Sequence, residues 1–249
     1  MKNFLFKIKY DGSSFHGWQI QSGDITVQQC LKDAFGQIFS QNVCVNGCSR
    51  TDSGVHANEF VFNVKLDTDM LPEKIICALN AYLPPSASVF HCEEVRDDFH
   101  ARFDCKGKEY IYKILNSPYP DPFLCDRAHQ YKYNLDEKML DRESKDFIGT
   151  HDFASFCASG SSVTSTERTI FDFSVRREDD MVIFRVCGDG FLYNMVRIMV
   201  GTLLDINRGK IEKGTIPEIL ESRDRKKAGI TAPACGLYLN KVFYEEMKS

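Results

Sequence analysis

The sequence predicts an α+β fold: two ferredoxin-like β-α-β-β-α-β halves that form a continuous antiparallel sheet backed by helices, with a central cleft. Three observations lead to this prediction. Apolar residues recur with the period of a strand or of a helix in the order strand, helix, strand, strand, helix, strand. That order occurs twice, and the join around 96–107 contains no Gly/Ser linker. We therefore expect halves at residues 1–104 and 105–249, packed side by side about the cleft.

In the first half, residues 3–10 alternate apolar and polar side chains, which is typical of a half-buried strand. Thr26 and Gln29 form a capping-box pattern, and apolar residues at helical spacing follow, so we expect a helix over 26–39. Pro72 occupies a favourable first position for a second helix, which the prolines after Leu83 end. The other expected elements of this half are strands at 43–48, 59–66 and 88–95.

The second half repeats the pattern. A capping box of Asn134 and Glu137 predicts the start of its first helix. The expected elements are a strand at 108–115, a helix near 135–148, strands at 169–176 and 181–187, a helix near 191–206, a short helix near 217–222 and a final strand within 236–244. Long loops remain at 117–130 and 157–169, and the second is almost wholly small and polar. It is either a dispensable surface loop or a loop that orders on a large ligand.

Composition limits the possible functions. The chain has 249 residues, 43% of them hydrophobic and 27% charged, which is ordinary for a globular protein with a full core. No apolar run approaches the roughly 20 residues of a membrane span, and the first residues alternate lysine with apolar side chains, so we expect a cytoplasmic protein. Ten dispersed cysteines fit a reducing compartment and favour small buried hydrophobes over metal ligands. A net charge of −4 excludes nucleic-acid binding by bulk charge alone.

One polar turn concentrates possible catalytic side chains. The segment NGCSRTDSGVHANEF, between two expected strands, contains Arg50, Asp52 and His56 together with Gly47 and Gly54. Glycines of this kind allow the backbone to bend tightly. Taken alone, an Asp in such a turn usually accepts hydrogen bonds from its own backbone, so this pattern does not decide between a structural and a catalytic role.

The helix near 191–206 adds a second clue. It is apolar almost all round, which predicts burial, and Arg197 is the only charged residue between positions 191 and 204. A guanidinium in such a place needs an anionic partner. If that partner were Asp52, the pair would place an ionised carboxylate where the two halves meet, which would suit a nucleophile. The residues alone leave four candidate partners, which are Asp11, Asp52, Asp104 and Asp189. Other polar or amphipathic side chains near the junction are His100, Arg102, Tyr110 and Tyr112.

Cofactor motifs give no signal. The chain contains no phosphate-binding G-x-x-x-x-G-K-S/T, no H-E-x-x-H and no G-x-S-x-G, and its six histidines lack ligand spacing. We expect no metal and no nucleotide cofactor.

Six blocks of sequence resemble the tRNA pseudouridine synthases of the TruA class. They are YDGSSFHGWQIQ at 10–21, SRTDSGVHA at 49–57, FHARF at 99–103, the Y-I-Y of 110–112, FLYNMVRIMVGTLL at 191–204 and ACGLYL at 234–239. They cover the whole chain in the family's order. The resemblance implies an isomerase that converts uridine to pseudouridine at positions 38, 39 and/or 40 in the anticodon stem-loop of tRNA.

The same resemblance implies roles for individual residues. Asp52 falls on the catalytic aspartate, Tyr110 on the active-site tyrosine and Arg197 on the arginine that pairs with the aspartate. Arg50 falls on the arginine that helps to displace the target base. His56, Arg102 and Leu237, which lie in the matching blocks, are expected to bind substrate with Arg50 and Tyr110. The resemblance also implies a homodimer, with no metal, no other cofactor and no membrane.

Two other functions stay open. Ferredoxin-like units resemble RNA-recognition motifs, so the chain could be a noncatalytic RNA-binding module, although it lacks the RNP1 string. A hydrolase that uses Asp52 on another glycosidic substrate would share the site and release a free base. To bind tRNA, the acidic chain needs a local basic track, and candidates are Arg168, Arg176, Arg177, Arg208, Lys210, Arg223, Arg225, Lys226 and Lys227.

Overall fold

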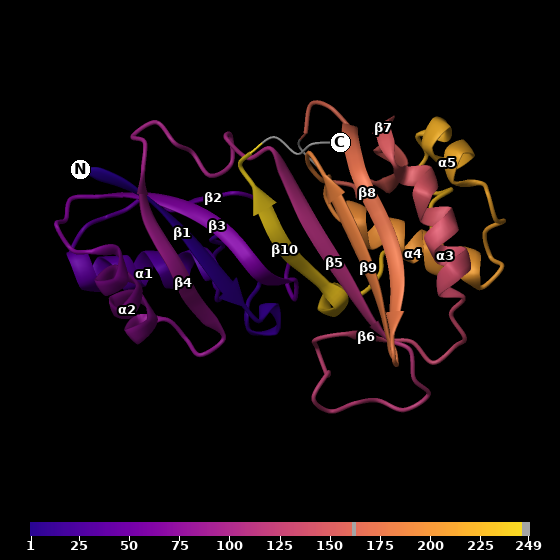
Figure 1. Cartoon of the computed structure of the whole chain (residues 1–249), viewed down its shortest axis with the longest axis horizontal. Coiled ribbons are helices and arrows are strands. Elements are labelled where there is room, and N and C mark those ends of the chain that lie inside the picture. The colour runs from indigo at the N-terminus through magenta and orange to yellow at the C-terminus, as the bar shows by residue number, and fades with distance from the viewer. Residues whose placement is uncertain (161–162, 246–249) are drawn as a thin grey trace. The chain divides into compact units, whose positions relative to one another are not determined.

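A computed structural model describes residues 1–160 and 163–245 and divides the chain into two compact units (Figure 1). The first unit comprises Met1–Lys106 and the C-terminal strand from Tyr238, and the second comprises Gly107–Leu237. Each unit combines a mainly antiparallel sheet with helices, which confirms the α+β class. The division into halves at residues 1–104 and 105–249, the first with Asp52 and the second with Tyr110 and Arg197, stays a prediction.

The first unit has the strand order of a ferredoxin-like fold. Its strands are β1 (Lys2–Tyr10), β2 (Asn46–Gly47), β3 (His56–Leu66), β4 (Ala87–Val95) and β10 (Leu237–Phe243), and its helices are α1 (Val27–Phe39) and α2 (Pro72–Tyr82). β4, β1, β3 and β2 lie in that order and are antiparallel. β10 also joins β3, in parallel, where Tyr238 lies opposite His56, so the antiparallel prediction is wrong at this pair.

Aromatic side chains fill the space between the first sheet and α1. The Phe6 ring stacks on Phe62 at 4.9 Å and meets Phe35 of α1 edge to face at 5.6 Å. The Thr26 side chain accepts a hydrogen bond from the Gln29 amide, which confirms the predicted N-cap. The Gln29 side chain instead donates to Asp33, so only half of the capping box forms.

The second unit has the strand order β5-β9-β8-β7, with β6 pairing β5 in parallel. Its strands are β5 (Gly107–Leu115), β6 (His129–Gln130), β7 (Gly149–Asp152), β8 (Glu167–Glu178) and β9 (Met181–Gly188), and its helices are α3 (Glu137–Ser144), α4 (Met195–Asn207) and α5 (Ile216–Ser222). β6 and β7 are short strands that the sequence pattern does not predict. The described residues also contain four short 3-10 helices, at Gly12–Ser14, Lys145–Phe147, Ala154–Phe156 and Ala234–Gly236.

Several predicted boundaries are wrong, each for a local reason. α3 is capped by Asp136, whose side chain accepts from the Met139 amide, and not by Asn134. α4 begins at Met195 because Asn194 has a left-handed backbone with φ of 59°. β2 shrinks to two residues, although Val43 and Val45 before it are buried. The loop expected at 157–169 ends where β8 begins, and part of it, 161–162, lies outside the described residues.

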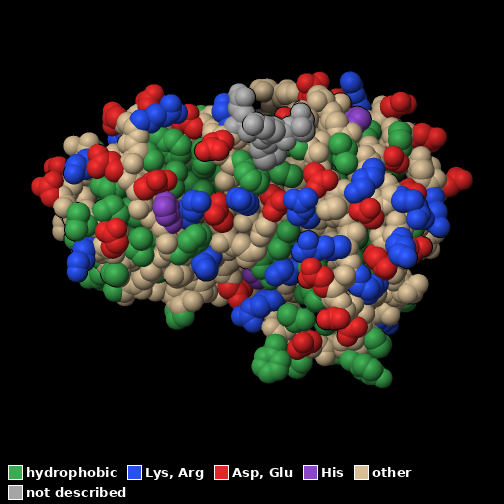
Figure 2. Space-filling model, in the orientation of Figure 1, with side chains coloured by type: hydrophobic (Ala, Val, Ile, Leu, Met, Phe, Trp, Pro, Cys, Tyr) green, Lys and Arg blue, Asp and Glu red, His purple; other side chains and the backbone are tan. Residues whose placement is uncertain are grey.

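Surface features bear on the remaining expectations. Acidic and basic side chains are interspersed over the face shown in Figure 2, so no broad basic field covers it. Cys44, Cys77 and Cys125 are exposed, which contradicts their interpretation as buried hydrophobes. Within residues 1–160 and 163–245, no helix has both the length and the apolar character that crossing a membrane requires.

Candidate active site

Asp52 lies in a tight turn at the start of β3. The Val55 amide donates to the Asp52 carbonyl at 3.1 Å, and Gly54 has a φ of 77°, which favours glycine. The Trp18 amide donates to the Thr51 carbonyl, also at 3.1 Å, and so attaches the turn to residues 10–21. Asp52 itself is half-buried. The turn therefore holds a carboxylate at a fixed point while leaving part of it accessible.

Two glycines allow the segment 10–21 to pack directly on this turn. A Cβ at Gly12 would lie 2.1 Å from the Val55 carbonyl oxygen, and one at Gly17 would lie 2.6 Å from the Thr51 carbonyl oxygen. Gly17 also has a φ of 86°. Because every close atom is backbone, a side chain at either position would have to displace the Asp52 turn. The glycines of the first sequence block thus set the position of Asp52.

His56 supports the turn from inside the first unit. Its side chain is only 2% exposed, its ring stacks on Tyr238 at 4.5 Å, and its Nδ1 accepts from the Gly12 amide at 3.0 Å. Since Nδ1 accepts this bond, the proton of a neutral ring lies on Nε2, and the 3.3 Å approach of the Asp11 carboxylate to Nδ1 is not a hydrogen bond. In the structure His56 therefore supports the turn, and its contact with substrate stays a prediction.

Buried hydrogen bonds continue this support. The hydroxyls of Tyr10 and Thr51 are 2.8 Å apart and buried, so β1 fixes the residue that precedes Asp52. Arg50, on the other side of Thr51, is exposed, as a residue that displaces a base must be. The turn therefore combines a rigid interior with a cation at the surface.

The block FHARF crosses the helix-free face of the first sheet. Asn3 of β1 donates to the Phe99 carbonyl at 2.9 Å, and Asn63 of β3 accepts from the Ala101 amide at 2.9 Å. These two amide side chains are buried and are joined at 3.0 Å. They hold the segment so that Arg102, predicted to bind substrate, is exposed.

An ion pair closes the same segment. The Asp104 carboxylate accepts from the His100 amide at 2.7 Å and pairs with Arg96. The hydrogen bond from His100, followed by that from Arg96, holds the pKa of Asp104 below its usual value. Asp104 is therefore engaged in shaping this loop.

Tyr110 and Tyr112 of β5 lie on one face of the second sheet, opposite Val186 and Phe184 of β9. Tyr110 is 6% exposed and meets Phe191 edge to face at 5.0 Å. Tyr112 is fully buried, and its hydroxyl donates to the Pro233 carbonyl at 2.8 Å. Burial raises the pKa of Tyr112 well above its usual value, Cys235 adds to this shift, and the charge of Arg197 opposes it. Tyr112 consequently stays a hydrogen-bond donor.

Arg197 is held in place by neighbouring backbone and side-chain acceptors. Its Nε donates to the Ala232 carbonyl at 2.7 Å and its Nη1 to the Asn194 side chain at 2.8 Å. The Ala232 amide donates back to the Arg197 carbonyl at 3.0 Å. The predicted burial of this helix is confirmed for most of α4, and Arg197, in its first turn, is half-buried. Its guanidinium is oriented by acceptors on two segments of the second unit.

The segment that follows Ala232 depends on close packing. A Cβ at Gly201 of α4 would lie 1.8 Å from the Ile230 carbonyl oxygen, and one at Gly236 would lie 2.6 Å from the Tyr112 ring. Thr202 accepts from the Gly229 amide at 2.9 Å. Leu237, predicted to bind substrate, is 6% exposed and directly follows this packed glycine. Its position is therefore fixed by contacts within the second unit.

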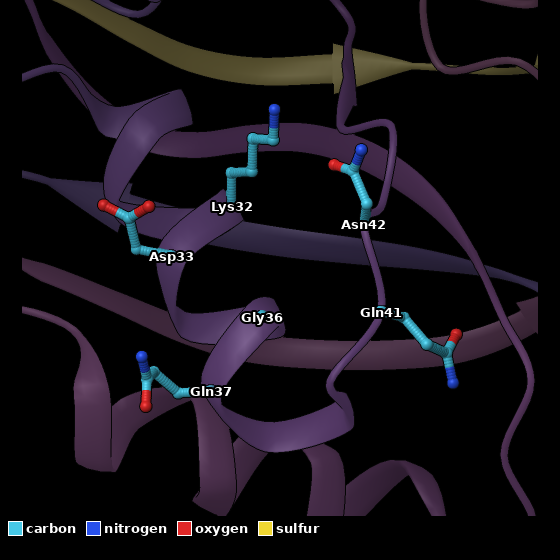
Figure 3. Close-up of a pocket in the computed structure, with 6 residues that line it drawn as sticks. All are labelled: Lys32, Asp33, Gly36, Gln37, Gln41 and Asn42. Atoms are coloured by element: carbon cyan, nitrogen blue, oxygen red, sulfur yellow. The ribbon is translucent and has the colours of Figure 1, made fainter.

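The described pocket does not include any predicted site residue. Lys32, Asp33, Gly36 and Gln37 of α1, with Gln41 and Asn42 after it, line a hollow of about 350 Å³. The labelled side chains do not converge on a common point (Figure 3). Because an active site needs polar groups that converge, this hollow is not a candidate. In the described part of the chain, no group of three or more His, Cys, Asp or Glu is placed to hold a metal ion.

Comparison with known proteins identifies the family. The family model for tRNA pseudouridine synthase matches residues 7–104 and 144–245. The chain belongs to the tRNA pseudouridine synthase family. It is 46% identical to tRNA pseudouridine synthase A of Acetivibrio thermocellus, 45% to that of Clostridium acetobutylicum and 43% to that of a Thermoanaerobacter species. Each alignment spans 244 residues, 98% of this chain and 100% of the relative.

The matched stretches include Asp52 and Arg197, whereas Tyr110 lies between them. The sequence pattern indicated these three residues but not Gly12, Gly17, the Asn3–Asn63 pair or Ala232, which hold the surrounding segments in place. The glycines of the first block were a usable signal, and so was the polar Asn63 within a buried strand. The backbone carbonyl of Ala232 could not have been found in this way, because residue type does not reveal which carbonyl accepts a hydrogen bond from Arg197.

Proposed function

We propose that this chain isomerises uridine to pseudouridine at one or more of positions 38, 39 and 40 in the anticodon stem-loop of tRNA. The half-buried Asp52 carboxylate, held in a turn that two glycines and a buried histidine support, is the observation that carries the proposal. Membership of the tRNA pseudouridine synthase family supports the reaction class.

The reaction uses the protein's own side chains. The bond between uracil nitrogen 1 and the ribose breaks, the base rotates, carbon 5 bonds to the ribose, and the proton on carbon 5 leaves while nitrogen 1 gains one. Asp52 attacks the ribose or begins elimination from it. The target uridine must first leave the stack, which costs a few kcal/mol. The exposed Arg50 and Arg102 are placed on the surface of the first unit, where they can contact displaced RNA.

Arg197 is proposed as the partner of Asp52. The other three candidate aspartates accept hydrogen bonds from groups other than Arg197. Asp11 accepts from the Ser13 amide and hydroxyl, Asp104 from His100 and Arg96, and Asp189 from the Thr169 amide. Because two fixed acceptors orient the guanidinium of Arg197, it can keep Asp52 ionised with little reorganisation. Tyr110 would stack on the displaced uracil and Leu237 would contact its other side.

The decisive experiment measures tritium release from tRNA whose uridines carry tritium on carbon 5, with no added cofactor. Wild-type protein is expected to release tritium, and Asp52→Asn to release less than about one hundredth as much while still binding tRNA. Mapping pseudouridine in the product then assigns positions 38, 39 and 40. Binding without release would favour a noncatalytic RNA-binding module, and a freed uracil would favour a hydrolase.

Arg197 requires a separate test. Arg197→Met is expected to abolish turnover and to lower the melting temperature, because it removes a charge together with its two hydrogen bonds. Full activity with unchanged melting would refute the pairing.

We also propose that the protein acts as a homodimer in the cytoplasm. All ten cysteines are thiols, which suits a reducing compartment. Light scattering during gel filtration tests the assembly, since the proposal requires twice the mass of one chain in solution.

A further inference from the structure

A cation lies against two tyrosine rings where β6 leaves the second sheet. Arg208, the C-cap of α4, places its guanidinium carbon 4.9 Å from the centre of the Tyr131 ring and 5.0 Å from that of Tyr133. Its Nε also donates to the Tyr131 hydroxyl at 2.9 Å. Lys132 lies 5.5 Å from the Tyr133 ring. We call these four residues the tyrosine–arginine cluster.

The backbone of the cluster is fixed by its neighbours. The Asn116 side chain at the end of β5 donates to the carbonyls of Tyr131 and Tyr133, at 2.9 and 2.8 Å. The Asn207 side chain donates to the Asn134 carbonyl at 2.8 Å. Both asparagines therefore tie this loop to regular structure, and its side chains are arranged before any partner arrives.

Three residues of the cluster are exposed and two of them are positively charged. Tyr133 is 54% exposed, Arg208 and Lys132 are exposed as well, and Tyr131 beneath them is buried. In residues 1–160 and 163–245, no carboxylate lies within ion-pair distance of Arg208 or Lys132. Burial, and then the charge of Arg208, lowers the pKa of His129. At neutral pH that histidine is uncharged and the positive charge of the cluster comes from two fixed cations.

Three carboxylates, on α3, on α4 and at the residue before α3, are bonded to groups outside the cluster. Glu137 pairs with Arg177 at 3.1 Å, and Asp205 lies 3.5 Å from Lys210. Asp136 accepts from the Met139 amide at the start of α3. The cluster itself therefore contains two cations, Arg208 and Lys132, on a chain whose net charge is −4.

We propose that the tyrosine–arginine cluster binds the tRNA substrate outside the catalytic residues, with a base stacked on Tyr133 and phosphates held by Arg208 and Lys132. An exposed aromatic face beside cations is the chemistry that recognises unpaired or terminal nucleotides. A guanidinium already packed on tyrosine loses little freedom when it meets a phosphate. The inference rests on the proposed function, which supplies tRNA as the partner. Tyr131, Lys132 and Tyr133 lie outside the stretches that the family model matches.

The test compares tRNA affinity among variants of the full chain, by filter binding between 50 and 200 mM KCl. Arg208→Gln is expected to weaken binding about fivefold or more at low salt and to reduce the salt slope by about one. Tyr133→Ala is expected to weaken it about fivefold or more, and Tyr133→Phe less than about twofold because the ring is kept. Arg142→Gln is the matched control, since it removes one exposed cation from α3.

Equal affinities for Arg208→Gln and Arg142→Gln, or equal losses for Tyr133→Ala and Tyr133→Phe, would overturn the inference. Melting temperatures of all four variants establish that each is folded. Pseudouridine formation by the wild type is measured on the same tRNA. Its absence would count against the proposed function, whereas normal formation with unaltered variant affinities would count against the cluster alone.

Discussion

Replacing Gly12 by alanine should displace the turn that carries Asp52. The new Cβ would lie 2.1 Å from the Val55 carbonyl oxygen, whereas ordinary contacts begin at 3.4 Å. It would also lie 2.9 Å from the Gly54 carbonyl carbon. The clash is between the Cβ and backbone atoms, so no rotamer change can relieve it. Either the turn or the segment 10–21 must therefore move by about 1 Å.

Such a movement has a predictable cost. Overpacking of this kind destabilises a protein by about 1–3 kcal/mol, and each kcal/mol lowers the melting temperature by roughly 2–4 °C for a chain of this size. A misplacement of about 1 Å in a catalytic group slows a reaction about 100-fold. Tritium release at saturating tRNA measures the rate, and scanning calorimetry measures the melting temperature.

Gly36→Ala is the matched control. Gly36 lies within α1, and a Cβ there would meet no atom within 4 Å. Alanine in the interior of a helix stabilises by about 0.5–1 kcal/mol relative to glycine, so this variant should melt higher and keep its activity. If Gly12→Ala retained both wild-type rate and wild-type melting, the proposed support of Asp52 by Gly12 would be refuted.

Three further outcomes are expected. Asp104→Asn should have a lower melting temperature than wild type at pH 7. Calorimetry should show this difference in melting temperature becoming smaller below about pH 4, because a carboxylate with a lowered pKa stabilises the fold only while it is ionised. A constant difference down to pH 3 would contradict this. Tyr112→Phe should lower the free energy of unfolding in urea by about 1 kcal/mol, since the Pro233 carbonyl loses its hydrogen-bond donor. An unchanged free energy of unfolding would argue against that hydrogen bond. Gly201→Ala should lower both the melting temperature and the turnover number, because its Cβ would lie 1.8 Å from the Ile230 carbonyl oxygen. An unchanged turnover number would show that this packing does not position Arg197.

Periodicity and capping predicted the order of the main elements because these signals are local. Thr26 caps α1 as its hydroxyl and spacing indicate. The errors arise where neighbouring residues compete for one structural role. Asp136 replaces Asn134 as the cap of α3, since both can accept an amide bond. Asn194 adopts a left-handed backbone and shortens α4, a conformation that apolar periodicity does not reveal.

The candidate site was predictable in its residues but not in its supports. A lone arginine in an apolar helix and an aspartate in a glycine-containing turn are both visible in the sequence. The contact between Gly12 and Val55 joins segments 43 positions apart, and Arg197 meets Ala232 across 35. Contacts between backbone atoms distant in sequence leave no compositional trace. Burial also changed the interpretation of His56, which a sequence pattern places in the turn but cannot place inside the protein.

The proposed function gives the close packing around Asp52 and around Arg197 one energetic reason. Extruding a uridine already costs a few kcal/mol, so any reorganisation of the catalytic groups would add to the barrier. Under the proposed function, Gly12 and Gly201 would limit that reorganisation, because each allows a close backbone contact that holds the turn of Asp52 or the segment before Ala232. Both glycines are buried, and neither can touch RNA. Alanine at either position should therefore lower kcat for pseudouridine formation far more than it raises KM for tRNA, and a change in KM alone would show that these glycines shape binding instead.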